Sequence, residues 1–127
     1  MKPRAEVDHL VVAARTLDEG VQWCEAALGV LPGPGGSHPL MGTHNRLLAI
    51  GSPAHPRSYL EIIAIDPAAP PRRRPGEQRW FDLDDGALQA ALARRGPRLI
   101  HFVARVRDAL AADNALAEVP LAIDRGE

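Results

Sequence analysis

The sequence lacks the features that mark membrane proteins and disulfide-stabilised secreted domains. No apolar run reaches the roughly 20 residues that span a bilayer, and no apolar signal segment precedes the first strand-like stretch. Cys24 is the single cysteine, so no intrachain disulfide can form. These absences lead us to expect a protein of the reducing cytoplasm without a membrane partner.

Basic and aromatic residues are also too few for a nucleic-acid-binding protein. The formal net charge is −1, which leaves no excess of Lys and Arg to neutralise phosphates. Aromatic residues make up 4% of the chain, too little for a base-stacking surface. The 127 residues are 46% hydrophobic and 24% charged, which suits one globular domain with a modest core.

A strand followed by a capped helix opens the chain. Residues 7–13 are aliphatic and β-branched, which predicts a buried strand. Thr16 and Glu19 then have the spacing of a capping box. Apolar residues recur on one helical stripe at Leu17, Val21, Cys24 and Leu28. With Gly29 at the C′ position, the helix should span about 17–28, and Cys24 should be inert core.

The next segment predicts a loop and a hairpin. Residues 32–37 are almost all Pro and Gly, which indicates a loop, with at most a short strand near 30–31. Residues 44–50 and 58–65 are strand-like and are separated by the Pro-containing turn at 52–56. Two strands joined by so short a turn should form an antiparallel hairpin.

A proline-rich linker follows at 66–78. Its run Arg72-Arg73-Arg74 is expected to be a solvated loop, with an anion site as the alternative. Residues 80–83 (WFDL) should anchor the linker back on the body. A short helix at 86–93 and a strand at 98–106 come next, and Asp108 is suited to cap a further helix.

Two segments of the chain are alike. Both 8–12 and 100–104 are apolar strands with a central histidine, and each leads into a capped helix. The histidines, His9 and His101, are 101 − 9 = 92 positions apart. Internal similarity of this kind indicates a duplicated supersecondary unit, of which the second copy has only begun when the sequence stops.

The stretches DHLVVAARTLDEG, HPLMGTHNRLLAIG and YLEIIAIDP resemble the glyoxalase-like domains of the vicinal oxygen chelate superfamily. The resemblance covers about residues 6–107. It implies an α+β fold of paired βαβββ modules whose sheets curl around a cup. We expect one domain, 1–127, made of a first module at about 6–66, a linker at about 67–84 and an apparently truncated second module at about 85–127.

The resemblance also implies a metal centre. In metal-binding members the ligands lie on the first and fourth strands of each module, which here gives His9, Glu61 and His101. A second carboxylate would fall past Glu127. Such donors suit a divalent ion such as Zn, Fe, Mn, Ni or Co and leave coordination sites open for a substrate with two adjacent oxygens.

Each of these residues also has a plainer interpretation. Glu61 lies among aliphatic residues, where a carboxylate must be paired or coordinated; a salt bridge to Arg46 or Arg98, or a place at a sheet edge, would serve as well. A histidine inside an apolar strand, such as His9 or His101, is more often a hydrogen-bonded core residue.

Three further residues are candidates for the cup. The GTHN stretch is typical of the resembling family and suggests that His44 and Asn45 line the cup and contact substrate, with strand-end capping as the alternative. His38, in the Gly/Pro loop, could act as a lid over substrate. Glu61 and His44 are the candidate catalytic residues.

The expected function is therefore a metal-dependent lyase, isomerase or dioxygenase-type enzyme that acts on a small oxygen-rich molecule. A metal-free binding protein for resistance or sequestration is the alternative, and a pure interaction domain is a third possibility. We also expect a homodimer, because a half-built sheet exposes an edge and an apolar face.

Overall fold

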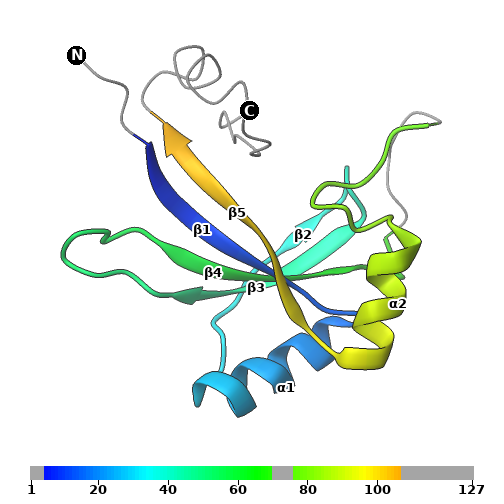
Figure 1. Cartoon of the computed structure of the whole chain (residues 1–127), viewed down its shortest axis with the longest axis horizontal. Coiled ribbons are helices and arrows are strands. Elements are labelled where there is room, and N and C mark those ends of the chain that lie inside the picture. The colour runs from blue at the N-terminus through cyan, green and yellow to red at the C-terminus, as the bar shows by residue number, and fades with distance from the viewer. Residues whose placement is uncertain (1–4, 70–75, 107–127) are drawn as a thin grey trace.

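The structure, a computed structural model, describes residues 5–69 and 76–106. These residues form a five-stranded mixed sheet with two helices (Figure 1). The elements are β1 (Ala5–Ala13), α1 (Leu17–Leu28), β2 (Ser37–His38), β3 (Thr43–Ala49), β4 (Tyr59–Ile65), α2 (Gly86–Arg95) and β5 (Arg98–Val106). Among the described residues, no helix is long and apolar enough to cross a membrane.

The strand order is β2-β3-β4-β1-β5, which is the order of a βαβββ module extended by one strand. β1 runs parallel to β4, as a crossover through α1 requires, and β3 pairs antiparallel with β4 as the predicted hairpin. β5 pairs antiparallel with β1, so the strand carrying His101 adjoins the strand carrying His9. The α+β fold class predicted from the sequence is confirmed.

Local chemistry fixes α1 where the sequence predicts it. The Thr16 hydroxyl oxygen accepts a hydrogen bond from the Glu19 backbone N–H at 3.1 Å, and Gly29 ends the helix with a φ of 74°. Gly20 allows the helix to lie close to the sheet, since a Cβ there would be 2.4 Å from Cγ2 of Ile62. Cys24 is fully buried in this contact, as expected.

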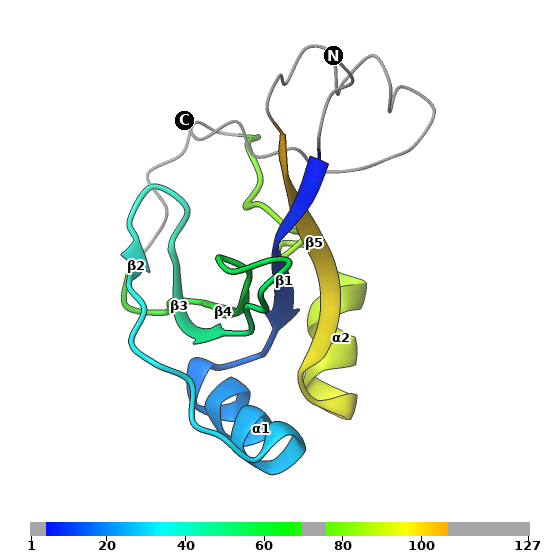
Figure 2. The ribbon, with the colours of Figure 1, turned by 90° about the vertical axis from the view of Figure 1, so that its left-hand side faces the viewer.

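The two helices pack on opposite faces of the sheet, as Figure 2 shows. The α1 face has a core of Val12, Cys24, Leu60 and Ile62. The opposite face, here termed the α2 face, has a core of Val11, Ala13, Ile63, Leu83, Leu92 and Val103. Leu83 is fully buried there, so the predicted anchoring of the linker is confirmed.

The Gly/Pro segment differs from its prediction. Residues 30–31 form no strand, whereas Ser37–His38 pairs with β3 as β2. Gly33 also forms an isolated bridge to Leu47. The glycines supply the N–H and C=O groups for this pairing, while the prolines take positions where no donor is needed. The arginine run at 72–74 and the helix expected after Asp108 lie outside the described residues.

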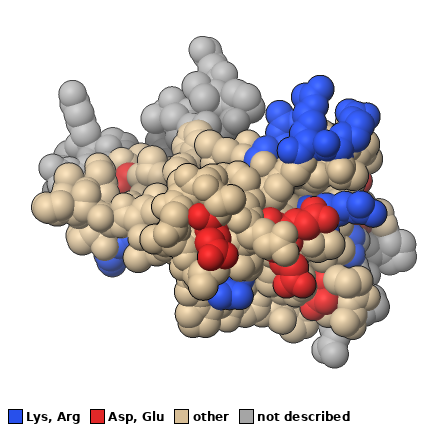
Figure 3. All heavy atoms as spheres, turned by 90° about the horizontal axis from the view of Figure 1, so that it is seen from below, with Lys and Arg blue, Asp and Glu red and all other residues tan. Residues whose placement is uncertain are grey.

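Seen from below, the surface carries charges of both signs (Figure 3). Acidic side chains gather in the middle of this face, and basic side chains lie mainly toward one edge. This mixture of charges is in keeping with the net charge of −1.

Candidate functional site

The register of three strands brings the predicted ligands onto the α2 face. Glu61 on β4 and His101 on β5 are both paired with Val11 of β1, one from each side. His9 lies two residues before Val11 on the same strand. Because neighbouring strands are about 4.8 Å apart, all three side chains start from one small area of the sheet.

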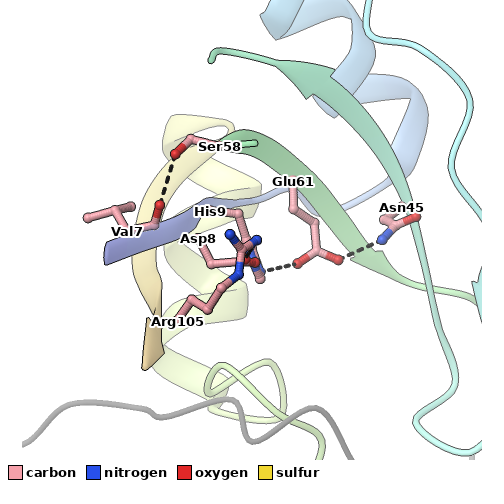
Figure 4. A network of polar contacts seen from close by, with 7 residues as sticks. All are labelled: Val7, Asp8, His9, Asn45, Ser58, Glu61 and Arg105. Atoms are coloured by element: carbon pink, nitrogen blue, oxygen red, sulfur yellow. Dashed lines mark hydrogen bonds and ion pairs between the residues drawn. The ribbon is translucent and has the colours of Figure 1, made fainter. Parts of the chain in front are cut away.

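Two of the three side chains are in contact. Nε2 of His9 lies 3.4 Å from Oε1 of Glu61, and each residue is only 5% exposed (Figure 4). The imidazole also stacks on the Tyr59 ring, with centroids 4.5 Å apart and an interplanar angle of 11°. Burial and stacking together leave the His9 ring little freedom to turn.

Asp8 orients the His9 ring. Its Oδ2 lies 2.7 Å from Nδ1 of His9, which favours a proton on Nδ1 and leaves Nε2 facing Glu61. Arg105 of β5 forms an ion pair with the other oxygen of Asp8. At the same end of the sheet, the Ser58 hydroxyl donates to the Val7 carbonyl at 2.9 Å and ties β4 to β1.

Asn45 orients Glu61 from the other side. Its Nδ2 donates to Oε2 of Glu61 at 2.6 Å, while the Gly36 backbone N–H donates to its Oδ1 at 2.9 Å. The Gly36 contact decides which end of the amide is the donor. The polar network therefore runs from β5 across β1 and β4 to β3 (Figure 4).

Two plainer interpretations of Glu61 are wrong. The residue is buried on β4, which lies between β3 and β1, and so is not at a sheet edge. Arg46 does not pair with it, because its guanidinium donates to the carbonyls of Pro32 and Gly33 instead. The partners of the Glu61 carboxylate are His9 and Asn45.

The His9–Glu61 contact shifts both pKa values. Burial disfavours the charged imidazole, but the carboxylates of Glu61 and Asp8 outweigh it and raise the pKa of His9 above its ordinary 6.5. Burial likewise favours the neutral carboxyl, but His9 and Asn45 outweigh it and lower the pKa of Glu61 below its ordinary 4.5. Without a metal, the two groups therefore form a buried ion pair around pH 6.

His101 does not join this contact. Its Nε2 lies 2.8 Å from Oδ2 of Asp82, an exposed residue of the segment before α2. Asp82 reaches it from a left-handed backbone conformation with a φ of 60°. Within residues 5–69 and 76–106, no three His, Cys, Asp or Glu side chains are grouped so that they could hold one ion.

The structure divides the predicted substrate-binding residues between the two faces. Asn45 and His38 lie on the α2 face: Nδ1 of His38 is 3.0 Å from the Thr43 hydroxyl, and its Nε2 is 3.4 Å from Nδ2 of Asn45. His44 points to the α1 face, because neighbours on a strand alternate. Its Nδ1 is 3.8 Å from the Asp66 carboxylate, and it borders a cavity of about 510 Å³.

His44 is therefore not brought together with Glu61, and the two do not form one catalytic pair. The cavity that it borders is lined also by Arg15, Thr16, Leu17, Asp18, Ile65, Pro67 and Gln89. His38 belongs to β2 rather than to a free loop, so its backbone is fixed by pairing with Thr43.

The donors at His9 and Glu61 fit a divalent ion. Two ligands each about 2.1 Å from one ion at a tetrahedral angle are about 3.4 Å apart, which matches the distance from Nε2 of His9 to Oε1 of Glu61. Asp8 contacts His9 and Asn45 donates to Glu61, so each donor is oriented by a second residue, as metal ligands commonly are. His101 would add a third donor by turning away from Asp82.

Sequence reasoning missed the residues that support these donors. Asp8 stands directly before His9, and this adjacency was the one available signal for its role. Arg105 and Gly36 gave no signal, because the register of β5 and the path of the Gly/Pro loop bring them to the network.

The mixed βαβββ sheet, with a His–Glu pair on one face, agrees with the resemblance to the vicinal oxygen chelate class. The family model for the glyoxalase-like domain matches residues 7–126, and the chain belongs to this family. The comparison with curated proteins found no match.

Solved structures share the fold. A methylmalonyl-CoA epimerase from Streptomyces coelicolor in complex with 2-nitronate-propionyl-CoA is 21% identical with a TM-score of 0.54, over 89% of this chain and 68% of that one. A hypothetical protein from Bacillus halodurans is 15% identical with a TM-score of 0.55, over 91% of this chain and 69% of that one. The Mycobacterium tuberculosis methylmalonyl-CoA epimerase is 21% identical with a TM-score of 0.51, over 88% of this chain and 62% of that one.

Proposed function

We propose that this protein is a divalent-metal-dependent enzyme of lyase or isomerase type that acts on a small molecule with two adjacent oxygens. The observation that carries the proposal is the buried contact between His9 and Glu61, in which each side chain is oriented by its own partner. Metal-ligating side chains are commonly oriented by a hydrogen-bonding partner of this kind.

Each residue of the candidate site has a proposed role. His9 and Glu61 would hold the ion, and His101 would be a third ligand once it leaves Asp82. When bound, the ion would polarise a substrate carbonyl and so favour proton loss from the neighbouring carbon. Asn45 and His38 border the site, where an amide and an imidazole can bind substrate oxygens. Glu61 would also exchange a proton with the substrate.

The similar solved structures support an isomerase-type reaction. Two of those reported above are methylmalonyl-CoA epimerases, one of them bound to a coenzyme A ligand. An epimerase inverts a carbon centre, and for a carbon next to a carbonyl this proceeds through removal and return of a proton. We propose the same class of reaction for this chain. We do not propose a coenzyme A ligand for it.

One observation favours a second function, metal-free ligand binding. Asp82 engages the Nε2 of His101, and a protonated His9 paired with Glu61 makes a stable buried pair without any ion. A protein of this kind would bind a small molecule against the same face and release it unchanged.

Titration of the full chain with Zn²⁺ or Co²⁺ separates the two functions. We expect one ion per chain, with binding weakened at least a hundredfold in His9→Ala and in Glu61→Gln. His55→Ala, which changes an exposed loop histidine, serves as the control and should bind like the unchanged protein. If no ion binds, or if all four proteins bind it equally well, metal dependence is refuted and metal-free ligand binding is favoured.

Cytoplasmic location and a homodimer remain predictions. Light scattering of the purified chain measures its oligomeric state directly.

A further inference from the structure

A tight turn holds an aromatic pair on the α2 face. The Asp84 carboxylate accepts hydrogen bonds from both the backbone and the guanidinium of Arg79, at 2.6 and 2.5 Å. Leu83 is buried in the core of that face. Trp80 and Phe81 lie between Arg79 and Leu83 in the chain and are therefore positioned by contacts at both ends of the turn.

The backbone of this turn is unusual. Phe81 and Asp82 have φ values of 56° and 60°, in the left-handed region that bulky side chains avoid. Strain of this kind persists where the surrounding structure enforces it, and it is common at binding sites. Here it packs the Phe81 ring against the core and leaves the Trp80 ring projecting.

Trp80 lies beside the polar network. Its ring meets the His38 ring edge to face, with centroids 5.1 Å apart at 78°. Nε2 of His38 is 3.4 Å from Nδ2 of Asn45, which in turn donates to Glu61. Two side chains thus separate the indole from the Glu61 carboxylate.

The same aromatic row reaches the other predicted ligand. Phe81 is 5.3 Å from Trp80 and 5.8 Å from His101 between ring centroids. The row His38–Trp80–Phe81–His101 therefore crosses the α2 face and borders the site on one side. Trp80 is 38% exposed among the described residues, so part of an apolar ring faces outward beside a polar centre.

We propose that Trp80 and His38 form an aromatic wall that selects ligands with an aryl group next to their two chelating oxygens. This inference rests on the proposed metal-dependent function. An aryl ring would cover the exposed indole and stack or meet it edge on, which a methyl group cannot do. The oxygens of the ligand would meanwhile face His9 and Glu61.

Two hydroxamates test the proposal in the Zn²⁺-loaded full chain. Benzohydroxamate and acetohydroxamate present the same two adjacent oxygens and differ only in phenyl against methyl. We expect the chain to bind benzohydroxamate at least tenfold more tightly, by calorimetry. That preference should fall at least fivefold in Trp80→Ala, and also in Trp80→Leu, which keeps an apolar side chain if the alanine variant folds poorly.

Phe102→Ala provides the matched control. Phe102 is also 38% exposed, but it pairs with Leu10 on the α1 face, and its removal should leave the preference unchanged. A second measurement uses Trp23→Phe, in which Trp80 is the only tryptophan. Its emission should be quenched by benzohydroxamate and not by acetohydroxamate.

The possible failures are distinguishable. If zinc binds and both hydroxamates bind with the same ratio of affinities in the unchanged chain and in Trp80→Ala, the aromatic wall is overturned while the proposed function stands. The same holds if the Trp80 emission does not respond. If the chain takes up no zinc, the proposed function fails and the wall fails with it.

Discussion

Nε2 of His9 lies 3.4 Å from Oε1 of Glu61 on the α2 face, although α1 and a hairpin separate the two residues in the chain. The parallel pairing of β1 with β4 produces this contact, because it places Glu61 beside Val11, two residues from His9. This buried pair is the centre of the candidate site.

Asp8→Asn should weaken metal binding without unfolding the protein. An amide can present its oxygen to the His9 ring but lacks the charge that holds the Nδ1 proton, and loss of such a supporting partner typically costs about 10–100-fold in metal affinity. Chelator competition measures the affinity, and a thermal melt followed by circular dichroism measures the stability.

Glu25→Gln, on the exposed side of α1, makes the same change of charge and should leave metal affinity unchanged. Equal affinities in Asp8→Asn and Glu25→Gln would show that Asp8 does not support the site.

The metal-free protein should be most stable between about pH 4.5 and 6.5, where both shifted groups contribute fully. The pKa of His9 is raised on folding, so its contribution is complete below 6.5 and is lost as the pH rises through the folded value. The pKa of Glu61 is lowered, so its contribution is complete above 4.5 and is lost as the pH falls through the folded value.

Urea unfolding of chelator-treated protein at several pH values measures this profile. In His9→Gln the decline in the free energy of unfolding above pH 6.5 should become shallower. An unchanged slope in that variant would mean that the His9–Glu61 pair is not formed in solution.

Gly35→Ala should disturb the site through the loop that covers Asn45. A Cβ on Gly35 would lie 2.1 Å from the Asn45 carbonyl oxygen and 2.4 Å from its Oδ1, so the loop must move. We expect a loss of about 1–3 kcal/mol in the free energy of unfolding, as for other overpacked positions, and weaker metal binding through Glu61.

The neighbouring Gly36→Ala is a matched control, since a Cβ there meets nothing within 4 Å. Its stability and metal affinity should stay near those of the unchanged chain. The close approach of the loop is refuted if the two variants behave alike.

Asp82→Asn should strengthen metal binding a few-fold by weakening the contact that holds Nε2 of His101. Asparagine tolerates the left-handed backbone at this position, so the turn should survive the change. The test is a double-mutant cycle with His101→Ala, measured by metal titration.

In the His101→Ala background, Asp82→Asn should have no effect on metal affinity. An equal effect in both backgrounds would mean that His101 is not a ligand and that Asp82 acts on the site by another route.

Much of the fold could be predicted because its signals are local. Thr16, Glu19 and Gly29 fix the ends of α1 by hydrogen bonds within a few residues, and the turn before Tyr59 fixes the hairpin. The prediction failed at β2, since Ser37–His38 becomes a strand only because β3 offers it backbone partners.

The site was less predictable, because the sequence does not show which face of β3 each residue occupies. Sequence reasoning placed His44 and Asn45 together in the cup, but neighbours on β3 point to opposite faces. β3 carries polar side chains on both sides, so its pattern does not reveal which side meets Glu61. The pairing of Asn45 with Ile63 decides the matter.

Residue type and short-range spacing were enough to predict most of the elements, and the family resemblance supplied His9, Glu61 and His101 as candidate ligands. The contact between His9 and Glu61, their orientation by Asp8 and Asn45, and the turn of His101 to Asp82 could be learned only from the folded chain. Those contacts depend on strand register and on the path of two loops, which are set by packing between segments far apart in the chain.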